Sequence, residues 1–198
     1  MYRFGSAFMK TLFISSYSGL LTIGILSNGK VVTQKEEISE RSHSAHLIPL
    51  IESTLKVNKL EINDINEIIV VNGPGSFTGV RLGITVAKTL GFTLKIPIKT
   101  ITSIEALAIS DDNQNKKIVT IDDSKGKYFA IFENNNLLGE INYLLDSKFK
   151  EFYQKNKHSI VKDNKLNIAV IYEYLKDGKM VNPHQLKPIY IKTIEVEK

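Results

Sequence analysis

The stretch that decides the fold is Val71-Asn72-Gly73-Pro74-Gly75-Ser76-Phe77-Thr78-Gly79-Val80-Arg81-Leu82-Gly83. It follows the β-branched run 67–71 and leads into a helical pattern over residues 76–92. A strand, a glycine-rich turn and a helix N-terminus in this order bring free backbone N–H groups and the positive end of a helix dipole to one point. The order predicts either an anion-binding loop or a tight turn that lets the helix pack closely on its sheet.

Glycines in this loop allow positive φ and close backbone approach, and Ser76 or Thr78 can cap the helix. The loop is not a Walker loop, because Gly79 is followed by Val and Arg rather than by Lys and Ser or Thr. Its glycine spacing also differs from the dinucleotide fingerprint. The residues that would contact an anion are Gly73, Gly75, Ser76, Thr78 and Arg81. A local salt bridge is an equally good interpretation of Arg81.

The composition is that of an ordinary globular protein, with 198 residues, 42% apolar and 24% charged. There is no cysteine, which excludes disulfides and thiol catalysis. No apolar run has membrane-spanning length, and the first eight residues lack the apolar core of a secretory signal. We therefore expect a cytoplasmic protein without a membrane contact.

The formal net charge is +5, but the lysines are spread along the chain. The densest runs, 116–117 and 148–157, are broken by Glu or Asn. Proteins that bind nucleic acid usually gather such charge on one face. The pattern favours a solvated lysine-rich surface and leaves direct RNA contact open.

Apolar patterning predicts a meander of three strands followed by alternating helices and strands. Asn28-Gly29 is suited to a type I′ hairpin turn, and Pro49 should kink its helix or confine it to the first turn. The expected strands are 10–15, 20–26, 31–38, 68–71 and 96–101, and the expected helices are 44–55 and 76–92. Antiparallel strands followed by units that add parallel strands make a mixed α/β sheet with flanking helices. This is the ribonuclease H-like, actin-like (ASKHA) layout.

A second copy of the meander supports this fold class. Residues 12–20 overlay residues 119–127 without a gap, and the turn at 27–29 then falls on the Asn-Asn-Asn run 134–136. After Glu140 we expect only a Lys/Asn-rich stretch, a short helix near 166–175 and a tail, so the second lobe is reduced. The predicted organisation is a flexible extension 1–9, a first lobe with the glycine-rich loop 10–105, and a smaller second lobe with a C-terminal helix and tail 106–198.

The run 73–83 resembles the Gly-Pro-Gly-Ser-Phe-Thr-Gly-x-Arg-x-Gly signature of the TsaB (YeaZ) family, a subunit of bacterial tRNA threonylcarbamoyladenosine synthesis. The resemblance covers residues 10–108 and extends weakly to Lys192. Supporting motifs are Arg41-Ser42-His43-Ser44, Leu47-Ile48-Pro49, Ile96-Pro97, Thr102-Ser103-Ile104-Glu105-Ala106-Leu107 and Pro188-Ile189-Tyr190-Ile191.

The resemblance implies a non-catalytic dimerisation subunit, or scaffold. This subunit would pair with a TsaD-like catalytic subunit in threonylcarbamoylation of the tRNA adenosine next to the anticodon. It also implies a TsaE-like ATPase as a further partner, a homodimer when the chain is alone, and tRNA contact through the complex. No cofactor of its own is implied, and a nucleotide would bind at the interface with the catalytic partner.

Two departures from the superfamily argue against chemistry in this chain. The catalytic paralogue TsaD carries a His-x-x-x-His metal pair, and the matching positions here are Ser103 and Leu107, which are not useful metal ligands. The first-strand Asp-Thr-Ser of the superfamily is replaced by Ser15-Ser16-Tyr17. Both departures disfavour the alternative functions, a metallopeptidase or an autonomous actin-like ATPase or sugar kinase.

Other polar residues do not assemble an active site by spacing. His43 and His46 can share a helix face, but the only acid near them is Glu40, so a partner-facing or solvent position is favoured. Asp122 and Asp123 would point to opposite faces of a strand, which favours a turn over paired catalytic acids. The four histidines, 43, 46, 158 and 184, lack any nucleophile context.

The helices of the first lobe offer the best candidate for a binding surface. Gly79, Gly83, Ala87 and Gly91 repeat every four residues, which permits close packing on the sheet or against another helix. The helix 44–55 has a broad apolar face, on which Leu47 and Leu50 are the expected outward positions. The predicted partner interface consists of His43, His46, Leu47, Leu50, Thr54, Gly79, Gly83 and Ala87.

Overall fold

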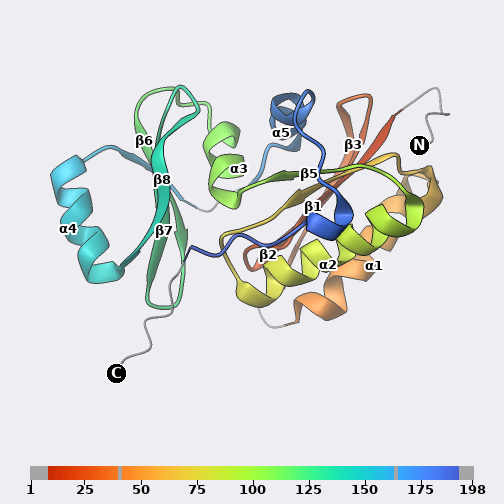
Figure 1. Ribbon diagram of the computed structural model, residues 1–198, viewed down its shortest axis with the longest axis horizontal. Coiled ribbons are helices and arrows are strands. Elements are labelled where there is room, and N and C mark those ends of the chain that lie inside the picture. Colours follow the sequence, from red (N-terminus) through yellow and green to blue (C-terminus); the bar gives the residue numbers. More distant parts are fainter. Residues whose placement is uncertain (1–8, 40–41, 163–164, 192–198) are drawn as a thin grey trace.

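Two β-sheets with helices between them and on their outer sides form the molecule (Figure 1). The structure is a computed structural model, and it describes residues 9–39, 42–162 and 165–191. The predicted extension 1–9 lies outside the described residues except for Met9, as do Glu40, Arg41 and Lys192.

The first sheet contains five strands in the order β3-β2-β1-β4-β5. The meander is antiparallel, and β4 and β5 run parallel to β1. The strands are β1 (Lys10–Ser15), β2 (Leu20–Ser27), β3 (Lys30–Ile38), β4 (Glu67–Val71) and β5 (Ile98–Ile101). The central strands are apolar along most of their length because helices cover both faces of the sheet. Asn28 and Gly29 have φ of 49° and 77°, which agrees with the predicted type I′ turn.

Helices α1 (His43–Val57) and α2 (Phe77–Leu94) cover one face of this sheet, and the short 3-10 helix η1 (Ile62–Asp64) leads from α1 to β4. The Oγ atom of Ser76 accepts a hydrogen bond from the Gly79 amide and caps α2, as predicted. Pro49 lies inside α1, beyond its first turn. Pro49 and Ala45 are both exposed, so water can reach the Ala45 carbonyl that the proline nitrogen cannot bond.

The second sheet has the strand order β8-β7-β6-β9, which repeats the arrangement of β3-β2-β1-β4 in the first sheet. Its strands are β6 (Lys117–Asp122), β7 (Gly126–Glu133), β8 (Asn136–Leu145) and β9 (Ser159–Val161), with β9 parallel to β6. Helix α3 (Ser103–Ser110) packs on β6 and β7 from inside the molecule, whereas α4 (Asp146–Asn156) packs on β7 and β8 from outside (Figure 1).

The second copy is therefore more complete than the sequence predicted. The stretch expected to be irregular contains α4 and β9. Phe149 and Phe152 of α4 pack against Phe129 of β7, with ring centroids 5.4 Å and 4.7 Å apart. These aromatic residues supply the apolar helix face that the surrounding lysines obscured in the sequence.

The C-terminal segment returns to the first sheet. Helix α5 (Ile168–Leu175) lies on the face of the first sheet opposite α1 and α2, where the Ile168 side chain sits against Gly24. The strap, as we call residues 181–191, then bridges β5 at Ile98 and contains the short helix η2 (Pro183–Gln185), which packs on α2. The predicted domain boundaries grouped α5 and the strap with the second lobe. The buried side chains of α5, Ile168, Ile171 and Leu175, instead cover the face of the first sheet that α1 and α2 cannot reach.

The expected fold class is confirmed: the chain is an α/β protein of ribonuclease H-like, actin-like type. Among residues 9–39, 42–162 and 165–191, no helix is both long enough and apolar enough to cross a membrane.

Candidate functional site

The glycine-rich loop after β4 is packed against the turn between β1 and β2. Gly73 and Gly75 have φ of 95° and 153°, and the Gly73–Pro74 peptide is cis. The Ser76 amide donates to the Tyr17 carbonyl oxygen at 2.7 Å. A Cβ atom on Gly75 would lie 2.3 Å from the same oxygen. The loop thus uses its glycines to let two backbone segments touch, as the tight-turn interpretation predicts.

The five residues expected to contact an anion do not converge on one site. The Ser76 hydroxyl is occupied by the Gly79 amide at 3.2 Å. Gly73 lies against the strap, whose Ile189 amide donates to the Asn72 carbonyl at 2.8 Å. Thr78 is exposed at the helix surface, and the Arg81 side chain turns toward the strap. Within the loop, the Ser76 hydroxyl and the Ser76 amide already have partners in the chain, and Thr78 and Arg81 point away from the loop to the helix surface and the strap.

The stripe of small residues on α2 packs on the chain's own sheet. Ser16 Oγ donates to the Gly79 carbonyl oxygen at 2.8 Å. Added Cβ atoms at Gly79 and Gly83 would lie 2.1 Å from the Ser16 carbonyl oxygen and 2.3 Å from Ser16 Oγ, respectively. At Gly91 the added atom would lie 2.6 Å from Ile98. Of the two alternatives, close packing on the sheet is the one the structure adopts.

The two positions matched from the sequence to the TsaD metal pair are buried in α3. Ser103 and Leu107 are buried, and the Ser103 hydroxyl donates to the Pro74 carbonyl oxygen. Within the described parts of the chain, no group of three or more His, Asp or Glu side chains could hold a metal ion. At the end of β1, Ser15 Oγ is buried without a hydrogen-bond partner among the described residues.

The remaining polar candidates have local structural partners. His43 is buried, and its Nε2 atom lies 2.8 Å from the Ser18 carbonyl oxygen. His46 contacts the Glu37 carboxylate, so the two histidines have different partners. Asp122 pairs with Lys127, and Tyr143 donates to Asp123 at 3.1 Å, beside the turn that follows β6. The turn interpretation of the two aspartates is thereby favoured.

The predicted partner interface needs correction, because nearly all of it is core. Seven of its residues are buried within the chain itself: His43, Leu47, Leu50, Thr54, Gly79, Gly83 and Ala87. Only His46 is partly exposed. The broad apolar face of α1 is used by the sheet and by α2 together, so its width does not indicate an excess of apolar surface.

In the middle of α1 the apolar side chain that faces outward is Ile48, 43% exposed, next to the fully buried Leu47. Ile48 borders an open groove of about 630 Å³ between α1, η1 and α2, which we call the α1–α2 groove. Its apolar lining is Ile48, Ile51, Leu55, Leu60, Ile62 and Leu90, and its charged lining is Glu52, Lys56, Lys59 and Glu61. An apolar floor with a charged rim is typical of a protein-binding surface. Leu90 is distant from α1 in sequence, and residues 60–62 lie beyond the end of that helix, which is why helical periodicity did not reveal the groove.

Comparison with known proteins supports a single assignment. Residues 29–189 match the profile of the family described as TsaD: tRNA N6-adenosine threonylcarbamoyltransferase. The chain is 34% identical over 134 residues to the tRNA threonylcarbamoyladenosine biosynthesis protein TsaB of Bacillus subtilis, covering 67% of this chain and 58% of that protein. It is 27% identical over 202 residues to the TsaB protein of Buchnera aphidicola from Acyrthosiphon pisum, covering 91% of both.

A solved structure has the same fold. YeaZ from Pseudomonas aeruginosa superposes with a TM-score of 0.75 at 18% identity, covering 91% of this chain and all of that one. The region that matches this chain covers 58% of the length of the Bacillus subtilis relative, little more than half of that protein. With the signature loop, the duplicated sheets and the family profile in agreement, the chain belongs to the TsaB (YeaZ) family, within the wider group that the TsaD profile describes.

Proposed function

We propose that this chain is a non-catalytic subunit that pairs with a TsaD-like catalytic subunit and supports threonylcarbamoylation of the tRNA adenosine next to the anticodon. The α1–α2 groove is the observation that carries the proposal. It is the surface where apolar residues of α1, η1 and α2 are exposed together, and its charged rim can fix the orientation of a protein partner.

The filled glycine loop supports a scaffold rather than an enzyme. At the N-terminus of α2, the Tyr17 carbonyl accepts from the Ser76 amide and the Ser76 hydroxyl accepts from the Gly79 amide. Ser103 and Leu107 stand in the core at the positions where the paralogue carries histidines. A metallopeptidase or an autonomous ATPase would need groups that these positions do not supply.

The proposal includes further partners. In the absence of the catalytic subunit, the α1–α2 groove would pair with a second copy of the chain, since its apolar floor would otherwise face water. A nucleotide would bind at the interface with the catalytic subunit rather than in this chain. A TsaE-like ATPase would join the complex, and tRNA would be reached in the cytoplasm through the assembly.

An omission experiment tests this proposal. The cognate TsaD-like and TsaE-like proteins are combined with ATP, the threonylcarbamoyl donor and tRNA, with and without this chain, and modified adenosine is measured by mass spectrometry. We expect product only when the chain and its partner are both present, and no peptide or ATP hydrolysis by the chain alone. Product formed equally without the chain, or turnover by the purified chain, would overturn the proposal.

A further inference from the structure

The edge of α2 that faces the strap carries aromatic and basic side chains. Phe77, Arg81, Lys88 and Phe92 are spaced so that they share one side of the helix. The strap contributes His184, Lys187 and Tyr190. We call these seven residues the α2–strap seam. No Asp or Glu occurs in α2 or in residues 181–191.

Side chains across the seam are already ordered. The Arg81 guanidinium carbon lies 3.7 Å from the Phe77 ring centroid and 5.5 Å from the Tyr190 ring centroid. Arg81 Nε donates to Tyr190 Oη at 2.5 Å. Further along the helix, Lys88 Nζ donates to the His184 carbonyl oxygen at 3.3 Å. Phe92 meets the His184 ring edge-on, with centroids 5.1 Å apart. The seam is thus held in place before any ligand binds.

The ordered groups remain open to solvent. Phe77 and Tyr190 are 57% and 53% exposed, and Arg81 is exposed as well. Arg81 forms no ion pair with an acid of the described chain. Its terminal nitrogens are therefore free to receive an external anion in the planar, bidentate manner that guanidinium groups favour.

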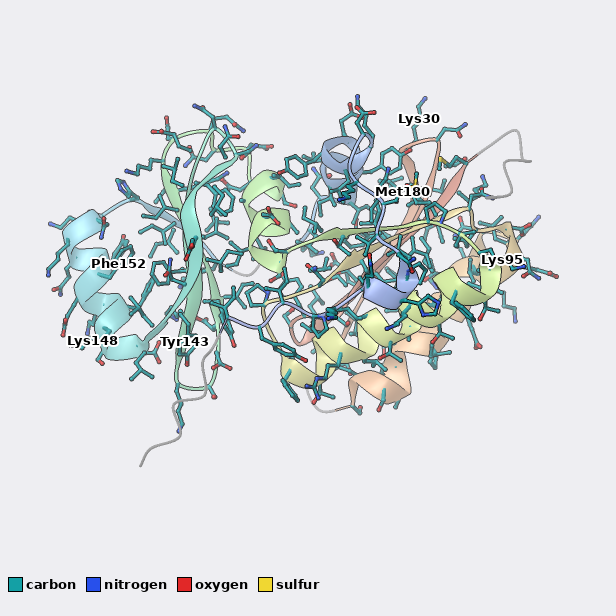
Figure 2. All side chains as sticks on the ribbon, viewed as in Figure 1. Lys30, Lys95, Tyr143, Lys148, Phe152 and Met180 are labelled. Atoms are coloured by element: carbon teal, nitrogen blue, oxygen red, sulfur yellow. The ribbon has the colours of Figure 1, made fainter. Side chains whose placement is uncertain are left out.

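Lysines elsewhere in the described chain are scattered or paired with acids. Lys30, Lys95 and Lys148 lie at widely separated places on the molecule (Figure 2). On α4, Lys148 pairs with Glu151, and no aromatic–arginine stack accompanies the charge. The seam differs because positive charge, exposed rings and the absence of acids coincide.

We propose that the α2–strap seam binds a segment of single-stranded RNA. Unpaired bases stack on aromatic rings, and phosphates pair with arginine and lysine. Phe77 and Tyr190 offer the rings, while Arg81, Lys88 and Lys187 offer the charge. An acidic peptide would use the charge but would gain little from two exposed rings, so RNA is the occupant that uses the whole seam.

The seam leaves the α1–α2 groove free. Leu90 of the groove follows Arg81 by nine positions, which at about 100° per residue places it half a turn around the helix. A protein in the groove and RNA on the seam therefore meet opposite sides of α2. The inference rests on the proposed function for its setting, and gives this chain an RNA contact of its own rather than one made only through the complex.

Fluorescence anisotropy with the full chain and a labelled single-stranded RNA of about 12 nucleotides tests the inference. Tyr190→Ser and Arg81→Gln should each weaken binding about tenfold. Tyr174→Ser is the matched control, because Tyr174 on α5 is also 53% exposed. Lys150→Gln controls for charge on α4. Both controls should bind within about twofold of the parent chain. Thermal melts establish that each variant is folded. Phe77→Leu keeps an apolar side chain but removes the ring, and it should weaken RNA binding independently of the other two variants.

Three results would overturn the inference. The first is no binding at low salt. The second is equal weakening by the seam variants and the controls, which would mean diffuse attraction. The third is equal or tighter binding of an RNA duplex or of polyglutamate. The omission experiment separates this failure from that of the proposed function. If the complex still modifies tRNA but Tyr190→Ser and Tyr174→Ser bind RNA equally well, RNA binding by the seam is refuted and the proposed function stands.

Discussion

The hydroxyl group of Ser16 donates to the carbonyl oxygen of Gly79 at 2.8 Å and so ties the end of β1 to the first turn of α2. The neighbouring Ser15 is equally buried, but its hydroxyl has no partner among the described residues. Ser15 is the last residue of β1, whereas Ser16 lies just beyond the strand. The two adjacent serines therefore have different partners and different energetic roles.

This difference predicts opposite effects for the same substitution. Ser16→Ala should lower the free energy of unfolding by about 1 kcal/mol, since it removes a buried hydrogen bond. Ser15→Ala should leave it unchanged or raise it, because it removes a buried hydroxyl that bonds to nothing. Urea denaturation of the two variants measures both values. Equal losses would mean that Ser15 has a bonding partner in solution.

The close contact between α2 and the β1–β2 turn predicts that Gly79 tolerates an added side chain much less well than Gly139 does. Gly79→Ala would place a Cβ atom 2.1 Å from the Ser16 carbonyl oxygen, and should cost about 3 kcal/mol or prevent folding. Gly75→Val should behave similarly against Tyr17. Gly139→Ala is the control: φ is positive there, at 92°, but the space is open, so about 1 kcal/mol is expected. Similar melting temperatures for Gly79→Ala and Gly139→Ala would contradict the packing described.

The buried ion pair between Glu67 of β4 and Lys99 of β5 predicts that substitutions of these two residues are strongly coupled. Lys99 Nζ lies 2.9 Å from Glu67 Oε1 and donates to the Lys176 carbonyl at 2.8 Å, while Thr11 donates to Glu67 at 3.1 Å. Lys99→Met should cost about 3–5 kcal/mol, because it leaves a carboxylate buried without its cation. The double variant Glu67→Gln/Lys99→Met should be more stable than Lys99→Met alone. A double variant whose loss equals the sum of the single losses would show that the residues are not coupled.

The parts of the fold that follow from local chemistry could be predicted from the sequence. The strands of the first sheet, the turn at Asn28-Gly29 and the capping of α2 by Ser76 were all predicted, because each depends on neighbouring residues alone. The duplicated meander was also predicted from its pattern. Helix α4 was missed because lysines surround the aromatic residues that form its buried face.

The α1–α2 groove was harder to predict, because it depends on how α1, η1 and α2 pack together. Leu47 and Ile48 are adjacent and equally apolar, yet one is buried and the other lines a groove. Which of them faces outward depends on where α2 and η1 lie. Gly75 likewise fits either an anion site or a tight turn until the position of Tyr17 is known. Periodicity predicted the helix itself, but it placed Leu47 and Leu50 on the outward face, and both are buried.

The corrected face of α1 gives a prediction about stability. Leu47→Glu should destabilise the chain by about 4 kcal/mol or unfold it, because a charge would enter a fully buried site. Ile48→Glu should alter the free energy of unfolding by less than about 1 kcal/mol, since Ile48 is partly exposed. Circular dichroism melts compare them. A stable, fully folded Leu47→Glu variant would mean that Leu47 lies at the surface and not in the core.

The most direct test of the scaffold account is the affinity of the Ile48→Glu variant for the cognate TsaD-like subunit, measured by isothermal titration calorimetry. Ile38→Glu is the control, because Ile38 on β3 is 74% exposed but lies outside the groove. A charge at the apolar floor of an interface should weaken binding by at least about a hundredfold, whereas the control should bind as the parent chain does. If folded Ile48→Glu binds the TsaD-like subunit as tightly as Ile38→Glu does, the α1–α2 groove is not the surface through which this protein works.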